Sequence, residues 1–451
     1  MTRLYKTTTL WAMAVFALAN YANAQNGINS PYSRYGFGMM ADRSMGFNKS
    51  MGGVAQGFRN GQQINAANPA SYSAVDSLTA LFDLGLSVYN GNYKMGNLQQ
   101  NAKNSSFDYI AFQCRLHKGL GITIGLLPYT NIDYNFTSNA ETIDGTSDNN
   151  ITSSYAFNGS GGLHQAFVGI GWNVLTPISI GANIGYLYGD YTHTSTLSYN
   201  TTNAYSLVRG YSANIGTWKA DFGIQGEFTL NKKDKITIGA TYGLGHDIKN
   251  RAYRHTQTIN SSSTVQSSTS DTLKNAFQLP HSLAFGVAYS HGTKWRVGAD
   301  IELEKWSKSK FPSNIESSIY TAQKGQLNDR LRLSLGGEYT PNDLSRNYLS
   351  RITYKVGGYY QQSYAKTSAN SSLSIDKPTE FGLTTGMSLP IQNRNIWYNS
   401  PRINITFGWI HTNIPYISNT SFEKSKLTEN YLRLSIGITF SERWFYKWKV
   451  E

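Results

Sequence analysis

The feature that most limits how this chain can fold is a regular alternation of apolar residues with small or polar ones. The alternation is clearest in residues 429–440, which read ENYLRLSIGITF. One face of that stretch is apolar and carries Leu432, Leu434, Ile436, Ile438 and Phe440. Side chains of a β-strand point alternately to opposite faces, so the pattern predicts a strand between two different environments. The other face holds Gly, Ser and Thr with little charge, which is typical of the inside of a barrel whose outside meets lipid.

The same alternation recurs along the chain and predicts fourteen strands. They are expected near residues 80–88, 110–116, 122–126, 166–172, 178–186, 220–228, 236–242, 283–289, 295–303, 331–339, 352–360, 380–389, 402–409 and 429–440. The links after the second, fourth, sixth and eighth strands are short. The links after odd-numbered strands are longer and rich in Ser, Thr and Asn, residues 249–278 being among the longest. The sequence therefore predicts an all-β fold, a 14-stranded antiparallel transmembrane β-barrel with short periplasmic turns and long external loops.

Composition agrees with a membrane barrel and argues against an ordinary soluble domain, a helical membrane protein and a nucleic-acid-binding protein. Only 15% of the 451 residues are charged, whereas soluble domains carry about 25%. No run of about 18 apolar residues follows the first segment, so no membrane-spanning helix is predicted. The net charge is +13, but the basic residues are scattered through turns and loops. We therefore expect contact with outer-membrane lipid and lipopolysaccharide head groups, and no nucleic-acid partner.

The chain begins like an exported protein. Residues 1–24 combine a basic start, an apolar core and a small-x-small cleavage site, which predicts a signal peptide. Residues 25–77 do not alternate but carry many aromatic side chains, so we expect them to fold as an N-terminal hatch, or plug, inside the lumen. Residues 78–440 then form the barrel, and residues 441–451 form a periplasmic C-terminal tail. The expected location is the bacterial outer membrane.

No grouping of residues points to catalysis. The eight His residues are dispersed and lack metal-ligand spacing. Asp300, Glu302 and Glu304 share the inward face of one predicted strand. We expect these carboxylates to pair with inward arginines, for which Arg296 and Arg332 are the candidates, and to form a structural charge cluster. The protein is accordingly predicted not to be an enzyme and to use no metal or other cofactor.

An MGG segment and an NPA segment precede the first strand, and further short motifs follow at residues 161–163, 279–286 and 295–300. Taken in order, these motifs resemble the FadL/TodX family of outer-membrane transporters. The resemblance spans most of the mature chain and implies a fourteen-stranded barrel with an N-terminal hatch. The residues that it assigns to the hatch and its gate are Gly52, Gly53, Asn68, Pro69 and Ala70.

The resemblance implies a function as well as a fold. Members of the family passively take up hydrophobic molecules, such as long-chain fatty acids or aromatic hydrocarbons, through a hatch-gated channel. They capture the molecule in an external groove and pass it to an internal apolar pocket, and in some members a bend in the third strand opens the wall sideways. Gly125 and Pro128 interrupt the third strand here, and because Pro cannot complete a ladder hydrogen bond we expect a lateral-opening kink at these residues.

Some features depart from the family pattern. Ser71 replaces the usual Gly after Asn-Pro-Ala, and residues 441–451 continue past the expected last strand. These departures keep an alternative in view, in which the protein is a barrel scaffold or shuttle component of a protein-secretion complex and binds a partner of that complex.

Overall fold

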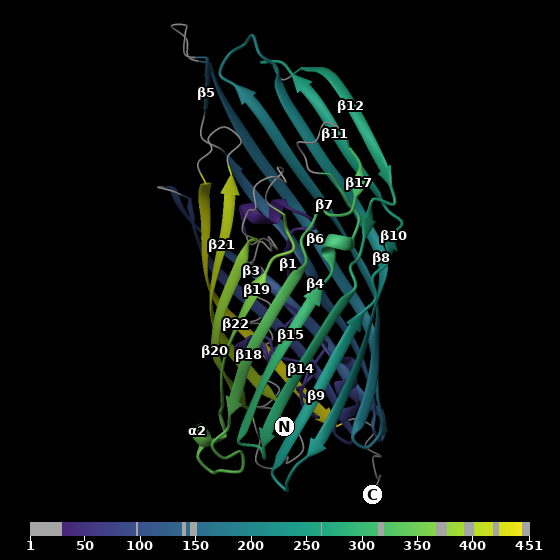
Figure 1. Cartoon of the computed structure of the whole chain (residues 1–451). Helices are drawn as coiled ribbons and strands as arrows, with labels where there is room; N and C mark the ends of the chain where they lie inside the picture. The colour runs from purple at the N-terminus through teal and green to yellow at the C-terminus, as the bar shows by residue number, and fades with distance from the viewer. Residues whose placement is uncertain are drawn as a thin grey trace, which may run out of the picture.

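The wall of the molecule is a closed sheet of antiparallel strands (Figure 1). The structure is a computed structural model and describes residues 29–95, 98–137, 141–144, 151–262, 264–313, 320–366, 377–391, 401–417 and 424–443. The predicted signal peptide and most of the predicted tail lie outside these residues. The fourteen wall strands are β2 (Thr79–Met95), β3 (Leu98–His117), β4 (Leu120–Thr137), β6 (Ile151–Leu175), β7 (Ile178–Tyr199), β8 (Ser206–Thr229), β9 (Asp234–Gly243), β14 (Ser282–His291), β15 (Trp295–Glu304), β18 (Arg330–Tyr339), β19 (Thr353–Gln362), β20 (Thr379–Pro390), β21 (Arg402–Ile417) and β22 (Lys424–Arg443).

The first and last wall strands close the barrel. β2 and β22 are antiparallel partners from the pair Thr79 and Arg443 to the pair Met95 and Leu427, without a register shift. The ring centroids of Phe82 and Phe440 lie 6.3 Å apart across this seam. The predicted 14-stranded antiparallel barrel is confirmed, although its last strand reaches Arg443 and so extends three residues past the expected boundary.

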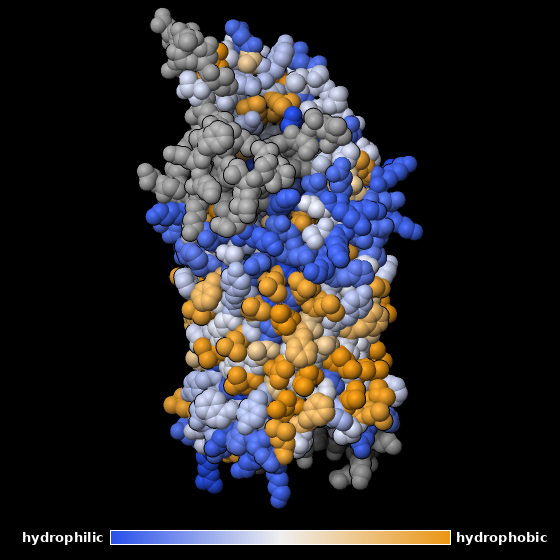
Figure 2. Space-filling view, viewed as in Figure 1, coloured by the Kyte–Doolittle hydropathy of each residue, from blue (hydrophilic) through white to orange (hydrophobic). Residues whose placement is uncertain are grey.

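An apolar belt covers the outside of the wall, and Figure 2 shows it on one side as a band below a polar region. On β22, the outward side chains of Leu432, Ile436 and Phe440 are exposed, whereas the intervening Arg433 and Ser435 are buried. The alternation in the sequence is therefore a division between a lipid-facing surface and a packed interior. A closed barrel with such a belt is the architecture of bacterial outer-membrane proteins, and this is where the protein resides.

Several strands are longer than the sequence pattern indicated, and they stand above the belt on one side (Figure 1). Residues 249–278 were expected to be a long loop, but they contain β11 (Arg251–Ile259) and β12 (Val265–Lys274), a hairpin that extends the sheet from β8. We call this hairpin, together with the upper parts of β6, β7 and β8, the fin. The loop prediction is wrong because strands with water on both faces need no apolar alternation.

The N-terminal segment lies inside the barrel (Figure 1, purple). Its short elements are η1 (Pro31–Arg34), β1 (Met39–Met40), η2 (Lys49–Met51) and η3 (Pro69–Ala74). We call residues 29–41 the strap and residues 42–78 the plug. The other short elements are β5 (Glu141–Asp144), β10 (Asp247–Ile248), β13 (Phe277–Gln278), η4 (Trp306–Lys308), β16 (Phe311–Pro312), β17 (Ala322–Gln323) and α2 (Tyr348–Arg351). None of the helices in the described ranges is long and apolar enough to cross a membrane.

The wall receives the plug on inward-facing glycines from eleven strands. A Cβ atom added at any of them would come within 3.0 Å of a plug atom. These residues are Gly121, Gly171, Gly181, Gly223, Gly239, Gly286, Gly298, Gly336, Gly357, Gly386 and Gly437. At Gly336, for example, the added Cβ atom would lie 2.2 Å from the carbonyl oxygen of Met51. The absence of side chains here lets the plug backbone lie directly on the wall, so plug and wall pack as one interior.

Candidate functional site: a gap in the wall closed by the chain's own N-terminal strap

The wall is interrupted between β3 and β4. Their pairing runs only from His117 and Leu120 up to Ile110 and Leu126. Above that point the only strand that pairs with β3 among the described residues is β2, whereas β4 continues along β6 to Thr137. The outer halves of two neighbouring wall strands are thus not hydrogen-bonded to each other.

The residues predicted to form a kink lie at the start of this gap. Gly125 occupies one of the last paired positions of β4, opposite Ala111. Pro128 follows directly after the pairing with β3 ends, next to a register shift against β6. Residues 127–132 of β4 are all buried, so the alternation of lipid-facing and inward side chains stops here. A strand can be covered on both faces only if another part of the chain takes the place of lipid.

The strap supplies that cover. Its β1 pairs antiparallel with the free edge of β4, Met39 opposite Asn131 and Met40 opposite Thr130. The Ala41 N–H donates to the Tyr129 carbonyl at 3.0 Å. These bonds give part of β4 the partner that β3 does not provide, so the strap acts as a short internal wall strand.

The other end of the strap is fixed to the opposite side of the gap. The Asn29 side chain donates to Asn104 of β3 at 3.1 Å. The Ser30 hydroxyl donates to the buried Glu429 of β22 at 2.7 Å. Because the strap binds strands on both sides, it bridges the gap with few hydrogen bonds.

An aromatic cage holds the strap from within. Phe37 is fully buried, and its ring lies 4.9 Å from that of Phe311, 5.4 Å from Phe277, 6.0 Å from Trp306 and 6.2 Å from Tyr191. These four residues come from wall strand β7 and from the short elements β13, η4 and β16. Edge and tilted contacts of this kind are favourable between aromatic rings. The cage is the apolar interior of the outer half, and the chain fills it with a phenyl ring of its own.

Two consecutive residues anchor the start of the plug to distant strands. Asp42 accepts from the Arg433 guanidinium of β22 at 2.5 Å, and Arg43 donates to Glu304 of β15 at 3.1 Å. Burial by itself raises the pKa of the Asp42 carboxyl, but Arg433 and Lys49 together hold that pKa well below its usual range. Asp42 therefore remains charged and paired at neutral pH. Charged pairs of this kind, once buried, are costly to break.

Lys49 forms a third anchor, and it marks the place where the wall opens. Its ammonium lies 2.5 Å from the Asp108 carboxylate, which also accepts from the Ser87 hydroxyl. Asp108 occupies the irregular position between Tyr109 and Phe107 in the register of β3 against β2. The side chain of this extra residue turns inward, so the irregularity supplies the anion that holds η2 of the plug.

The predicted hatch glycines lie in a tight turn against the wall. Gly52 and Gly53 have φ angles of +66° and +85°, which side chains with a Cβ rarely adopt. The Gly52 N–H donates to Thr384 at 2.9 Å, and its carbonyl accepts from Arg332 at 3.0 Å. The turn is therefore bound on both sides by wall residues.

The predicted NPA segment begins η3, the second short helix of the plug. The Asn68 side chain accepts from the Ala70 N–H at 3.1 Å and donates to the Gln56 carbonyl at 3.0 Å, while Pro69 occupies the first helical position. Ser71, which replaces the Gly of the family pattern, stabilises the start of the same helix, since its hydroxyl donates to the Asn68 carbonyl at 2.7 Å. These residues cap a helix that lies on the inward glycines of β6, β7 and β8.

The five residues of the expected charge cluster face inward but do not form one group. Asp300 accepts from the backbone N–H groups of two plug residues, Ala55 at 2.6 Å and Gln56 at 2.9 Å. Arg332 binds the Gly52 turn, as described above. Glu302 lies 3.6 Å from Arg330.

The remaining two residues of that set, Arg296 and Glu304, have other partners. Arg296 pairs with Glu338 at 3.3 Å, and Glu304 pairs with Arg330 at 3.1 Å. The cluster is therefore divided between plug contacts and wall ion pairs. Sequence reasoning missed Arg330, Glu338 and the anchors Asp42 and Lys49, because a pair 391 residues apart leaves no local pattern.

A cavity of about 90 Å³ remains between plug and wall. It is lined largely by polar and charged residues, among them Asp42, Arg43, Asp221, Glu302 and Arg332. Such a lining favours water over a hydrophobic molecule. Within the described part of the chain, no group of three or more His, Cys, Asp or Glu side chains is placed to hold a metal ion.

These features define an outer-membrane β-barrel of the FadL type with a plugged lumen, and solved structures support that class. A TodX monoaromatic hydrocarbon channel with a ΔS2S3 mutation has a TM-score of 0.60 at 15% identity, covering 89% of this chain and 99% of its own. A Pseudomonas aeruginosa FadL homologue has a TM-score of 0.60 at 11% identity, with the same coverage. The Pseudomonas putida toluene transporter TodX has a TM-score of 0.55 at 14% identity, covering 89% of this chain and 98% of its own. At such identities the likeness shows the fold alone.

The family is shown by a different comparison. The BamG family model matches residues 5–451, so the chain belongs to the BamG family. No curated protein matches the chain. The predicted resemblance to FadL and TodX thus holds for the fold, while family membership lies with BamG. Two of the solved neighbours named above are a monoaromatic hydrocarbon channel and a toluene transporter.

Proposed function

We propose that the protein is an outer-membrane channel, closed at rest, for passive uptake of hydrophobic molecules such as aromatic hydrocarbons or long-chain fatty acids. In this proposal the molecule leaves the barrel sideways, between β3 and β4. The observation that carries the proposal is the parting of these strands above Ile110 and Leu126, with the strap in place of a wall strand. The hydrocarbon channels with the same fold support the substrate class.

Phe37 suggests how the closed state would open. Its ring occupies the aromatic cage as a small aromatic ligand would, and it lies only two residues before Met39, which pairs with β4. A hydrophobic molecule that takes the place of Phe37 would draw β1 away from the edge of β4. The binding energy of the molecule in the cage would then shift the strap from closed to open.

The plug would stay in place during this movement. The cavity beside it is small and polar, and the turn at Gly52 and Gly53 and the helix beginning at Asn68 are bound to the wall. We therefore assign these residues to anchoring the hatch and assign gating to the strap. This arrangement directs a hydrophobic molecule from the outer cage to the gap instead of through the lumen.

The test is Phe37→Ala, which empties the cage without touching the bonds of β1. Benzene enters dry apolar cavities of this kind, so the purified variant should bind benzene or toluene, detected by NMR, more tightly than the wild type does. Cells that carry the variant should take up toluene faster. Phe58→Ala is the matched control, because Phe58 is an equally buried plug residue. Uptake by Phe37→Ala equal to that of wild type and of Phe58→Ala would count against the proposal.

A second candidate function is a structural component of a protein-secretion complex, and the fin favours it. Ten consecutive residues form β12, nine of them exposed, and among the described residues this strand pairs with β11 alone. The free edge of such a strand offers unpaired backbone groups to an extended segment of a partner. The fin thus gives a surface outside the membrane on which a protein could dock.

The outer part of the fin hairpin can be removed while Ala252 and Leu273 keep their places against the interior. Replacing the residues from Tyr253 to Thr272 by a short turn should abolish recovery of protein partners after cross-linking and affinity purification, if the second candidate is correct. Toluene uptake should be unchanged in that variant. Recovery of the barrel by itself from cells with an intact fin would reject the second candidate and leave the first untouched.

A further inference from the structure

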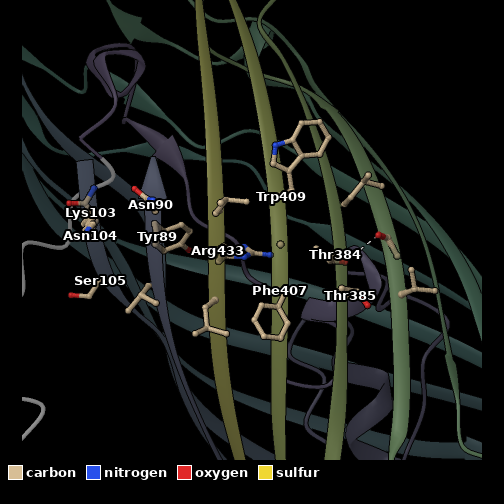
Figure 3. A pocket seen from close by; sticks show the side chains of 17 residues that line it. Tyr89, Asn90, Lys103, Asn104, Ser105, Thr384, Thr385, Phe407, Trp409 and Arg433 are labelled. Carbon is tan, nitrogen blue, oxygen red and sulfur yellow. Dashed lines mark hydrogen bonds between the residues drawn. The ribbon is translucent and has the colours of Figure 1, made fainter. Parts of the chain in front are cut away.

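A groove of about 980 Å³ opens on the outer surface of the wall, across β2, β3 and β19 to β22 (Figure 3). Ligand sites typically enclose about 300–1,000 Å³. No residue of the aromatic cage lines the groove, and the exposed part of its lining belongs to the lipid-facing belt.

The groove has a polar end and an apolar floor. One row of register partners leads across it from Lys103 through Asn90, Leu432 and Trp409 to Leu383. Figure 3 shows Lys103 and Asn90 on one side of the groove and Trp409 toward the other. The first two residues are polar and exposed, and the last three are 60%, 40% and 48% exposed apolar side chains. Strands are about 4.8 Å apart, so the row spans roughly 20 Å.

Beyond Leu383 the row reaches a hollow instead of a side chain. Its next member is Gly358, followed by Leu335, and both face outward on β19 and β18. The hollow belongs to a second groove of about 720 Å³, which shares Val356, Gly357 and Leu383 with the first. The apolar floor therefore continues across five strands, from β22 to β18.

The charges of the groove have one sign. The lining contains two charged side chains, Lys103 and Arg433, and both are basic. Arg433 is directed inward to Asp42, which leaves Lys103 as the basic group at the exposed polar end. A basic residue beside a long apolar channel, on a surface already facing lipid, is complementary to an anionic amphiphile.

We propose that this groove is a specific binding site for a membrane lipid with an anionic phosphate head group. The head group lies at Lys103 and Asn90, and an acyl chain follows the floor past Trp409 into the hollow at Gly358. The site lies on the outer half of β3, which has no wall partner on its other edge, so a bound lipid adds contacts where the wall is weakest.

Purified, delipidated protein can be titrated with dimyristoyl phosphatidylglycerol or with phosphatidylcholine carrying the same chains, and adducts counted by native mass spectrometry. We expect one phosphatidylglycerol to bind about fivefold more tightly than phosphatidylcholine, the difference that one lysine supplies. Lys103→Gln should remove this preference. Gly358→Leu, which fills the hollow, should weaken both lipids about tenfold.

Matched controls are available on other parts of the wall. Lys294→Gln alters a lysine in the turn after β14, and Gly226→Leu alters an outward glycine of β8 whose added side chain would meet only the mobile ring of Phe228. Neither should change lipid binding. The shift in gel mobility on heating checks that each variant forms a barrel.

Three results would overturn the proposal. The first is equal affinity of the wild type for the two lipids, and the second is equal binding by Gly358→Leu and Gly226→Leu, since either means that lipid covers the belt without a specific site. The third is a dimer of barrels that Gly358→Leu abolishes, which would assign the groove to a second copy of the chain.

Discussion

Two seams of the same barrel behave differently. Between β2 and β22, seventeen residue pairs follow one another without a break, and this seam closes the wall. Between β3 and β4, pairing stops at Ile110 and Leu126, and the strap takes over. The strands are similar in length, so length does not explain the difference. β22 keeps its apolar face outward throughout the belt, whereas β4 has six buried residues in a row, residues 127–132, with Pro128 among them.

The comparison shows that a strand partner in this barrel can be exchanged for a piece of the N-terminus. The closing seam is held by a full ladder of backbone hydrogen bonds. The gap is held by two residues of strand pairing, by side-chain hydrogen bonds of the strap such as those of Asn29 and Ser30, by one ring in a cage and by ion pairs just behind it. A part of the wall with so short a backbone ladder is the part that opens at the lowest free energy.

The anchor at Asp42 should show the largest effect on stability. Asp42→Asn leaves Arg433 buried without its counterion, which typically costs about 3–5 kcal/mol of unfolding free energy. Thermal unfolding followed by loss of the folded band on gels measures the change. Asp271→Asn is the control, because its pair with Arg254 in the fin is half exposed and worth at most about 1 kcal/mol. Equal losses in the two variants would mean that the plug is not held by this pair.

Substitution of an inward-facing wall glycine that contacts the plug should have an intermediate effect on the free energy of unfolding. Gly336→Ala brings a Cβ within 2.2 Å of the Met51 carbonyl, and overpacking of this kind costs about 1–3 kcal/mol. Gly337→Ala is the adjacent control, since its nearest neighbours lie at 3.1 Å or more on the wall itself. Urea unfolding of both variants separates the two cases. If Gly337→Ala were the more damaging change, close contact between plug and wall would not be what these glycines provide.

The smallest expected effect is the pH dependence of the stability that the Asp42–Arg433 pair contributes. The pKa of Asp42 is depressed in the folded protein, so its pair contributes stability above the unfolded-state value of about 3.9 and loses it as pH falls below that value toward the folded-state pKa. The difference in melting temperature between wild type and Asp42→Asn should therefore be constant from about pH 5 to 8. It should shrink only under stronger acid. A difference that disappeared near pH 6 would assign the effect to another group.

The sequence predicts the belt well and the rest of the molecule less well, for a physical reason. Where one face meets lipid and the other meets the interior, as in β22, the two environments impose alternation on the residues. In β12 both faces meet water, and no such pattern forms. Pro128 is visible because proline restricts the backbone, and the Gly52 turn is visible because glycine permits backbone angles that other residues rarely adopt. The role of Phe37 cannot be predicted from the sequence, since the cage around its ring is assembled from residues up to 274 positions away.

The most direct test of the central claim compares the two seams by disulfide trapping in a Cys114→Ser background. Met39→Cys with Asn131→Cys would join the strap to β4, and Leu84→Cys with Ile438→Cys would join β2 to β22; both are directly opposed pairs. Opposed antiparallel residues are about 4.5–5.5 Å apart at Cα, which suits a disulfide.

Toluene uptake by cells carrying each oxidised pair, with and without reductant, is the measurement. The account predicts that the bond between strap and β4 stops uptake and that reductant restores it, while the bond across the closing seam has no effect. Uptake that continues at the wild-type rate with the strap locked to β4 would contradict it.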